Sequence, residues 1–465
     1  MNNHYDAIII GAGMSGLAAG IRLAMFDKKV VILEKHSISG GLNSYYQRRI
    51  AQTKEIIELD VGLHALTNFA TKGQRGKPLT KLLKQLRIPY EALSLEEQTY
   101  SLIQFESETL KFSNDFELLR SEISLKFPKE KDSFEKFVAY LNEYNEVSLQ
   151  AKYVSARAVL NKYFNNELLE EMLMAPLLIY GSAWENDMDF SQFVIMFKSL
   201  YFEGFSRPKG GVRTVLNLLL DKYKSLGGEI RFRSPVESIQ VKDAVQGVYL
   251  KNGEFLEAKK IFSSAGLPET FSMVNKKTQF LPQVGKLSFT ETILVYEDKS
   301  ILKDFDPTIV FYNSSDKYLY QKPKNLFDSS SAVFCLPDNY NRQNDQGHAM
   351  ARITYMANYD LWKAMERKSY LLQKEEVFKE AKKLSEKLIK PNSEPLFKDV
   401  FTPTTIERYT NHFDGTVYGS TTKLRDGKTE IEGLHIIGTD QGFLGIVGSM
   451  LSGISMANLY GLMES

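Results

Sequence analysis

The residue types best suited to chemistry gather within the first 34 positions. Gly11, Gly13 and Gly16 form a Gly-x-Gly-x-x-Gly sequence, and Glu34 follows 18 residues after the last of them. Glycines at this spacing allow a tight turn, a close approach of the backbone to a pyrophosphate, and close packing of the following helix. An acid at the position of Glu34 can hold ribose hydroxyls. The pattern therefore predicts a dinucleotide site.

A second group of glycines favours FAD over NAD. The pair Gly40-Gly41 comes shortly after the ribose acid and would allow a second close approach of the backbone to a long ligand. Near the C-terminus an apolar run ends in Gly438-Thr-Asp440, and three glycines then lead into a helical segment: Gly442, Gly445 and Gly448. A glycine-lined helix start can face phosphates or carbonyls, and Asp440 could take a ribityl hydroxyl. The alternative is a plain strand–helix unit that only packs on the sheet.

His64 is the histidine for which we predict a catalytic role. It ends the segment Asp60-Val-Gly-Leu-His64, where a strand should stop and a loop begin. There it could donate a hydrogen bond or carry a proton near a flavin. The alternative is a histidine that ties two backbone segments together. The six histidines show no metal-ligand spacing, so we expect no metal site.

The elements that must position these residues follow from the pattern of apolar residues. Residues 7–10 and 30–33 are short apolar runs typical of buried parallel strands, and 17–26 has helical composition between them. Residues 45–49 and 56–61 read as a pair of strands. A further helix is expected over 212–226, and Asn252-Gly253 predicts a type I′ hairpin.

Residues 78–205 are largely helical in composition, and residues 190–205 are apolar on more than one face. Such a helix could form the wall of an apolar ligand tunnel or contact a membrane. The alternative is an ordinary buried helix. The only cysteine, Cys335, lies in an apolar run and is expected to be a buried strand residue, with attachment to a flavin as the other option.

These motifs, together with Asp60-Val-Gly62-Leu-His64 and Pro208-Lys-Gly210-Gly211, resemble the phytoene desaturase, carotenoid isomerase and retinol saturase group of the FAD-dependent amine-oxidase superfamily. The resemblance runs from the first strand to the last helix. In this group the residue matching Val236 contacts adenine through its backbone, and the turn matching Ala265-Gly266 lies beside the nucleotide.

The resemblance implies an α/β fold: a Rossmann-like FAD-binding domain with a parallel sheet and a β-meander, and an inserted α+β substrate domain. We expect the FAD domain over residues 1–70, 206–290 and 401–465, and the substrate domain over 71–205 and 291–400. The predicted cofactor-binding residues are Gly11, Gly13, Met14, Ser15, Gly16, Glu34, Lys35, Gly41, Leu42, Asn43, Gly62, Leu63, His64, Val236, Ala265, Gly266, Gly438, Asp440, Gly445, Ile446 and Gly448.

The composition of the chain limits the classes of binding partner and the cellular locations that we expect. The chain has 465 residues, enough for two domains, and 58 Lys and Arg against 57 Asp and Glu, a net charge of +1. Nucleic acid is therefore not an expected partner. The single cysteine suits a reducing compartment, the first strand leaves no room for a signal peptide, and no run reaches about 18 consecutive apolar residues. We expect a cytoplasmic protein, with peripheral membrane contact as an option.

The predicted function is that of an FAD-dependent oxidoreductase acting on a long apolar polyene or isoprenoid, carotenoid- or retinoid-like, by desaturation, saturation or flavin-assisted isomerisation of C–C double bonds. No second Gly-x-Gly-x-x-Gly unit is visible, so the electron acceptor or donor stays open, transiently bound nicotinamide included. One alternative is an FAD-dependent amine oxidase, for which Phe443 is the only ring near the C-terminal helix. The other is a non-catalytic prenyl- or lipid-binding protein on the same fold.

Overall fold

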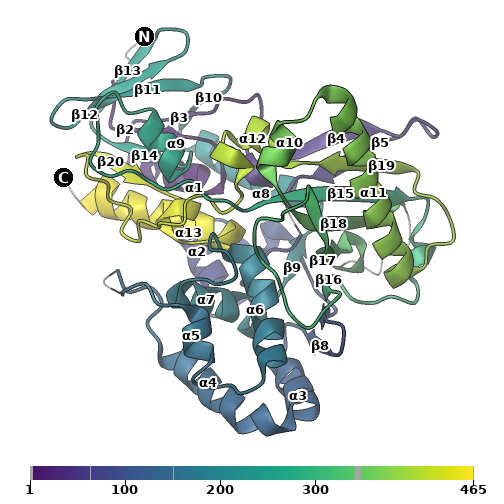
Figure 1. Cartoon of the computed structure of the whole chain (residues 1–465). Coiled ribbons are helices and arrows are strands. Elements are labelled where there is room, and N and C mark those ends of the chain that lie inside the picture. Colours follow the sequence, from purple (N-terminus) through teal and green to yellow (C-terminus); the bar gives the residue numbers. More distant parts are fainter. Residues whose placement is uncertain (1–3, 63, 150, 341–346, 464–465) are drawn as a thin grey trace.

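The computed structural model describes residues 4–62, 64–149, 151–340 and 347–463. A five-stranded parallel sheet lies in the upper left part of Figure 1. Its strand order is β10-β3-β2-β14-β20. The strands are β2 (Ala7–Ile10), β3 (Val30–Leu33), β10 (Glu229–Arg231), β14 (Ile261–Ser263) and β20 (Leu434–Ile436). All residues of β2, β3, β14 and β20 are buried, which explains why these runs are continuously apolar. The α/β fold is as predicted.

Alternate side chains of the parallel sheet face two different layers. Ile9 and Phe262 pack against three helices, α1 (Met14–Ala24), α8 (Val212–Ser225) and α13 (Gly445–Met456). Ile8 and Leu434 pack against the second layer, a four-stranded sheet of order β1-β13-β12-β11. Its strands are β1 (His4–Tyr5), β11 (Val236–Val241), β12 (Val245–Leu250) and β13 (Phe255–Ala258). β11, β12 and β13 form the predicted meander.

The first and last helices cross at a distance that only glycine allows. A Cβ atom added at Gly453 of α13 would lie 2.1 Å from the carbonyl oxygen of Ser15 and 3.1 Å from the nitrogen of Ala19, both in α1. Gly16 allows an equally close contact between α1 and the turn before it, since a Cβ added there would lie 2.1 Å from the carbonyl oxygen of Gly11. These contacts fix α1 against β2 on one side and α13 on the other.

A seven-stranded mixed sheet of order β19-β15-β18-β17-β16-β7-β8 forms the second half of the molecule. α11 (Arg367–Ile389) covers one face, and a bundle of helices covers the other, at the bottom of Figure 1. The strands are β7 (Ser101–Gln104), β8 (Thr109–Phe112), β15 (Ser288–Tyr296), β16 (Ile309–Asn313), β17 (Phe327–Cys335), β18 (Ala349–Ala357) and β19 (Phe397–Phe401). The bundle helices are α3 (Phe116–Lys126), α4 (Lys131–Glu143), α5 (Ala156–Leu160), α6 (Glu167–Gly181) and α7 (Phe190–Phe197).

The remaining elements connect these layers. They are α2 (Pro78–Leu86), α9 (Leu267–Ser272), α10 (Tyr359–Lys363) and α12 (Pro403–Thr410), with the strand pairs β4 (Tyr45–Arg49) and β5 (Ile56–Asp60), and β6 (Leu95–Glu97) and β9 (Ser206–Pro208). The domain boundaries expected after residues 290 and 400 fall inside β15 and β19. Those two strands pair with each other, and β15 also pairs with β18; because these partners are distant in sequence, local composition could not locate the strand ends.

The predicted type I′ hairpin is wrong in its turn, although β12 and β13 do pair. That turn needs a positive φ at both central residues. Gly253 has φ +84°, but Asn252 is not among the residues with positive φ. The side chain of Asn252 instead accepts a hydrogen bond from the backbone N–H of Glu254 at 3.0 Å. This bond gives the N–H a partner while Asn252 keeps a negative φ.

Residues 190–205 are core rather than tunnel wall. α7 continues into a π-helical turn, Lys198–Phe202, and Phe193, Phe197 and Tyr201 are fully buried. Their rings meet aromatic residues of the neighbouring helices and sheet; for example, Phe137 of α4 lies 6.1 Å from Phe197, and Phe112 of β8 lies 5.1 Å from Tyr201, between ring centroids. The segment is apolar on several faces because the protein surrounds it.

Within the described residues, one helix, Gly445–Met463, is long and apolar enough by length and composition to cross a membrane, although the sequence predicted no unbroken apolar run of that length. It comprises α13 and a π-helical continuation, Ala457–Met463. About half of it, 56% of the tested window, is buried inside the protein, and Gly453 holds it against α1. A buried core helix passes the same test of composition, and the packing here is that of a core helix.

His435 in β20 gives the fold a dependence on pH. Its ring stacks on Tyr460 at 4.1 Å and on Phe262 at 5.4 Å. Burial, together with nearby Lys260 and Lys428, lowers the pKa of His435 to about 4 from its ordinary value of 6.5. A proton therefore binds the unfolded chain more readily than the folded one between these two values. The contribution of His435 to the free energy of unfolding is therefore fully present above pH 6.5 and is lost as the pH falls toward 4.

We predict that His435→Phe removes this pH-dependent part of the stability while keeping the stack of rings. Relative to the variant, the native protein should lose about 2 kcal/mol of unfolding free energy between pH 7.5 and pH 5.0, as the linkage relation gives for this pKa difference. Urea unfolding at the two pH values measures it. Equal changes in the two proteins would show that His435 does not titrate as described.

Candidate active site

A long groove runs along the carboxyl edge of the parallel sheet, with a volume of about 440 Å³. The turn after β2 forms its floor. Gly11 has φ +95°, and a Cβ there would lie 2.4 Å from the hydroxyl of Ser264, so the turn needs glycine. A Cβ added at Gly13 would meet no atom within 4 Å. The backbone at Gly13 therefore faces open space, where a ligand can approach it.

The start of α1 opens into this groove without a side-chain cap. The residue before the helix is Gly13, and no side chain accepts a hydrogen bond at this end. Met14 and Ser15 line the groove. Free backbone N–H groups and the helix dipole make such an end a favourable place for a phosphate. Gly16 does not line the groove; its role is the close helix–strand contact described above.

Glu34, at the end of β3, lines the groove and is only 7% exposed. One carboxylate oxygen accepts the backbone N–H of Ala12 at 2.9 Å, and the other accepts that of His36 at 2.8 Å. Each oxygen keeps a lone pair for another donor. Glu34 therefore holds the glycine turn in place and can still accept a hydroxyl of a ligand.

The second glycine pair forms the middle of the groove. Gly40 and Gly41 both have positive φ, and a short 3-10 turn, Gly41–Asn43, follows. A Cβ at Gly41 would again meet open space. Gly62 crosses above this turn, since its Cβ would lie 2.2 Å from the carbonyl oxygen of Leu42. The neighbouring position, Leu63, lies outside the described residues.

Asp60, at the end of β5, anchors the crossing segment from below. Its carboxylate accepts hydrogen bonds from Arg207 at 2.5 Å and from the backbone N–H of Val212 at 3.2 Å. Val212 is the first residue of α8. The Asp-x-Gly-x-His segment is thus held by the strand and helix that follow the helical bundle in the sequence.

The C-terminal glycines close the groove. Gly438 has φ +83° and lies against Ser15, whose hydroxyl would be 2.8 Å from an added Cβ. α13 begins at Gly445 and, like α1, has no side-chain cap. Gly448 lies behind it, against Phe443, and lines neither this groove nor the chamber described below.

Asp440 does not face the groove, in contrast to its predicted contact with a ribityl hydroxyl. It is 2% exposed. Its carboxylate pairs with Lys423 at 2.9 Å and accepts the backbone N–H groups of Leu267 at 2.6 Å and Ser420 at 2.9 Å. The buried ion pair and the two amide bonds occupy it. Asp440 therefore fixes the loop, and the groove-facing position belongs to Thr439.

The far end of the groove is lined by Val236, Ala265 and Lys35, as expected for an adenosine end. Gly266, also predicted there, does not line the groove. It has φ +103°, and its Cβ would lie 2.1 Å from a carboxylate oxygen of Glu269. Burial raises the pKa of Glu269, against the opposing effect of His412.

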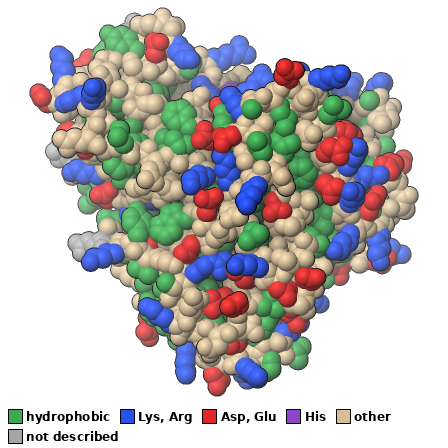
Figure 2. All heavy atoms as spheres, viewed as in Figure 1, with side chains coloured by type: hydrophobic (Ala, Val, Ile, Leu, Met, Phe, Trp, Pro, Cys, Tyr) green, Lys and Arg blue, Asp and Glu red, His purple; other side chains and the backbone are tan. Residues whose placement is uncertain are grey.

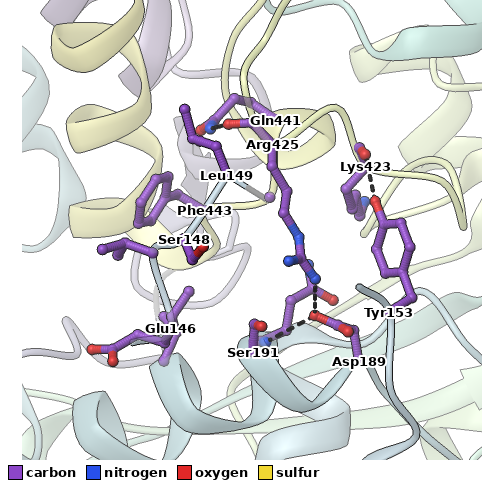
Figure 3. A pocket seen from close by; sticks show the side chains of 14 residues that line it. Glu146, Ser148, Leu149, Tyr153, Asp189, Ser191, Lys423, Arg425, Gln441 and Phe443 are labelled. Carbon is purple, nitrogen blue, oxygen red and sulfur yellow. Dashed lines mark hydrogen bonds and ion pairs between the residues drawn. The ribbon is translucent and has the colours of Figure 1, made fainter. Parts of the chain in front are cut away.

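A chamber of about 200 Å³ adjoins the groove and is mostly apolar. Its apolar walls are Ile179, Tyr180, Phe289, Val333, Phe401, Ile406, Val417, Tyr418, Leu444 and Ile446. The sequence reasoning proposed wall residues in 190–205, but the helical wall comes from the end of α6, at Ile179 and Tyr180. Phe443, predicted as the ring near the C-terminal helix, lines an outer pocket with Arg425 and Asp189 instead (Figure 3).

Four residues line both cavities: Leu42, Asn43, Thr439 and Ser449. They come from the second glycine turn, the loop after β20, and α13. Groove and chamber therefore adjoin at a junction formed by these four residues. Sequence reasoning missed Thr439 and Ser449; both lie within the glycine-rich C-terminal motif, which was the available signal.

A polar cluster forms one wall of the chamber. Nε2 of His64 lies 3.2 Å from a carboxylate oxygen of Glu291 and 3.2 Å from the hydroxyl of Thr354. Nε of Arg352, which is 1% exposed, donates to Glu291 at 2.7 Å and its guanidinium also bonds the carbonyl oxygen of Val61. Burial alone would raise the pKa of Glu291, but Arg352 and His64 hold it below its ordinary value.

These contacts place the ring of His64 at the chamber wall, and its catalytic role stays a prediction. Its ring contacts side chains of β15 and β18, not backbone, and it lines the chamber with Glu291 and Thr354. A charged Glu291 can accept from the imidazole and orient its other edge. Cys335, which is fully buried, donates to the carbonyl oxygen of His64 at 3.4 Å. Burial raises the pKa of its thiol to about 12, and it lines neither cavity, so attachment to a flavin is not supported.

The family pattern described as flavin containing amine oxidoreductase matches residues 14–459. Prolycopene isomerase of Daucus carota is 25% identical over 509 residues, covering 98% of this chain and 80% of that protein. All-trans-retinol 13,14-reductase of Danio rerio is 22% identical over 320 residues, covering 60% of this chain and 51% of that protein. The crystal structure of an oxidoreductase from Methanosarcina mazei has a TM-score of 0.66 at 15% identity, covering 97% of this chain and 99% of that chain, and shows a shared fold.

The contrast between Gly13 and Gly16 provides a test of the groove. Gly13→Ala adds a methyl group where only a ligand would meet it, so FAD affinity should fall at least about tenfold while unfolding free energy changes by less than about 0.5 kcal/mol. Gly16→Ala overlaps the backbone at Gly11 and should destabilise the protein by about 1–3 kcal/mol. Fluorescence titration of FAD and urea unfolding measure the two effects. A Gly13→Ala protein that binds FAD normally would contradict the assignment.

Proposed function

Because the chain belongs to the flavin containing amine oxidoreductase family, we propose that it is an FAD-dependent oxidoreductase acting on an apolar polyene or isoprenoid, by desaturation, saturation or isomerisation of a C–C double bond. The observation that carries this proposal is the junction between the groove and the apolar chamber, which four residues share. A cofactor that lies along the groove would end at the wall of the chamber.

The residues present fit FAD. Gly11, Gly13 and the uncapped start of α1 would hold the pyrophosphate, Glu34 a ribose, and Val236 the adenine end. The junction residues and the uncapped start of α13 would hold the remaining part of the cofactor. Bound FAD supplies the capacity to accept or give a hydride. We further propose that residues 1–70, 206–290 and 401–465 form the FAD domain and that residues 71–205 and 291–400 form the substrate domain. The boundaries after residues 290 and 400 would move to the ends of β15 and β19, because as predicted they divide these strands.

The chain's own residues would then place and protect an apolar substrate. The chamber walls exclude water, which suits a hydrocarbon and strengthens electrostatic interactions inside. His64, whose imidazole lines the chamber, is the residue positioned to hold or move a proton, and Nδ1 is the atom for it because Nε2 is bonded to Glu291. Glu291 accepts from that imidazole, and Arg352 keeps Glu291 ionised. Tyr180 and Tyr418 add hydroxyl-bearing rings to the wall.

The names of two relatives support the proposed substrate class. One is named for isomerising prolycopene and another for reducing retinol, and both ligands are apolar polyenes. The alternative of a non-catalytic prenyl-binding protein would not require an open dinucleotide groove with free backbone at Gly13 and Gly41. The amine-oxidase alternative is distinguished by the test below.

We predict that His64→Gln lowers turnover of a polyene at least about 100-fold, the usual effect of removing a proton-transferring group, without changing FAD content. The matched control is His348→Gln, because His348 also pairs with an acid, Glu55 at 2.8 Å, but lines neither cavity. The readout is flavin absorbance and product chromatography after anaerobic mixing, with reduced holoprotein for retinol and prolycopene and with oxidised holoprotein for phytoene, since only oxidised flavin can accept a hydride.

Amines serve as the opposing substrates in the same assay. Under air, putrescine or cyclohexylamine should release no peroxide. Peroxide release with an amine, combined with no spectral or product change with any polyene, would reject the proposed substrate class in favour of amine oxidation. Unchanged polyene turnover in His64→Gln would reject the proposed role of His64 but would not affect the proposed substrate class.

A further inference from the structure

A third cavity, of about 450 Å³, lies on the outer side of α12 and is strongly basic. Five cationic side chains line it: Arg48, Lys363, Arg367, Lys374 and Arg408. Asp399 is the one acid among the described residues that line it. The lining therefore carries five positive charges and one negative charge, in a chain whose net charge is +1. The elements that supply these residues, β4, α10, α11, β19 and α12, gather in the same part of Figure 1.

Most of these cations are not neutralised. Lys363 pairs with Glu407 at 2.7 Å, and Arg48 lies 3.7 Å from Asp399. Arg367, Lys374 and Arg408 form no ion pair within the part of the chain that the structure describes. Elsewhere on the face drawn in Figure 2, basic and acidic side chains are interspersed. Unpaired charge of one sign around a cavity repels itself, so a site of this kind favours an anion.

Aromatic rings hold three of the cations in place without cancelling their charge. The guanidinium of Arg48 lies 4.5 Å from the ring centroid of Tyr46, that of Arg367 5.5 Å from Tyr370, and that of Arg408 5.7 Å from Tyr409. Stacking on a ring face stabilises a cation and restricts its movement. Planar guanidinium groups positioned in this way are suited to the oxygens of a phosphate.

The position of this cavity relates it to the other two. Phe401 lines both the basic cavity and the apolar chamber, and Tyr409 lines both the basic cavity and the dinucleotide groove. A molecule bound in the basic cavity would therefore contact Phe401, which also lines the chamber. The hydroxyls of Thr404 and Thr405, in the first turn of α12, add hydrogen-bonding groups to the same wall.

We propose that the basic cavity binds the phosphate or diphosphate group of a small molecule whose other end reaches the chamber past Phe401. This inference rests on the proposed function and deepens it. Two sources share this chemistry: an isoprenoid substrate that carries a diphosphate, and a nicotinamide dinucleotide that reduces the flavin from the chamber side. In either case the phosphate would serve only to bind and orient. Bound FAD would exchange a hydride with the ligand; a nicotinamide needs nothing more, whereas a C–C bond must also gain or lose a proton, for which His64 is the chamber residue.

The test uses FAD-loaded protein and isothermal titration with inorganic pyrophosphate. The variant is Arg367→Gln with Arg408→Gln, two exposed side chains without ion pairs. The matched control is Arg49→Gln with Lys368→Gln, which removes the same charge from adjacent positions that do not line the cavity. Pyrophosphate should bind the native protein and the control equally, and the variant at least about tenfold more weakly, as expected for loss of charge-assisted bonds.

Further titrations distinguish the sources. Tighter binding of geranylgeranyl diphosphate than of geranylgeraniol, with the difference lost in the variant, would assign the site to a substrate head group. Tighter binding of NADPH or NADH, again lost in the variant, would assign it to a reductant. Either result supports the proposal.

Three results would overturn it: no binding of pyrophosphate, equal binding to native protein and variant, or binding only to vesicles containing phosphatidylglycerol, which would indicate a membrane surface. These outcomes are separate from the test of function. If neutral polyenes react with the flavin and no phosphate compound binds, the proposed function stands and this inference fails. If pyrophosphate binds as expected and no polyene reacts, the phosphate site stands and the proposed function fails.

Discussion

The close crossing of the first and last helices is the contact on which the site depends. Gly453 of α13 lies against the backbone of Ser15 and Ala19 in α1, and a single methyl group at that glycine would overlap the chain. The contact brings the C-terminal motif beside the N-terminal glycine turn, although more than 400 residues separate them. The uncapped start of α1 then faces the groove and that of α13 faces the adjoining chamber, and at each of them backbone N–H groups and the helix dipole favour negatively charged or polar groups.

Buried polar contacts hold the loops around that crossing. Asp440 uses its whole carboxylate on Lys423 and on two backbone amides, and Glu34 bonds two amides at the opposite side of the groove. An unpaired charge in such positions would be costly, so these networks fix the backbone that lines the cavity. On the chamber side, Arg352 and Glu291 do the same for His64. The site thus combines rigid polar supports with an apolar interior.

Much of the fold could be predicted from sequence because its signals are local. The strand at 7–10, the glycine turn and the acid at Glu34 lie within one βαβ unit, and twelve predicted cofactor residues, from Gly11 to Gly438, line the groove. What could not be predicted depends on distant contacts. Glu291 and Thr354 meet His64 from 227 and 290 residues away, and Asp440 turns inward because Lys423 is there. Likewise, residues 190–205 read as a tunnel wall until the helices packed around them are known.

The most direct test of the account is an experimental structure of the protein saturated with FAD. The account predicts electron density along the whole groove, with the adenosine end beside Glu34 and Val236 and the isoalloxazine ring at the junction formed by Leu42, Asn43, Thr439 and Ser449. Density in the reverse orientation, or a groove filled by side chains and without cofactor, would contradict it.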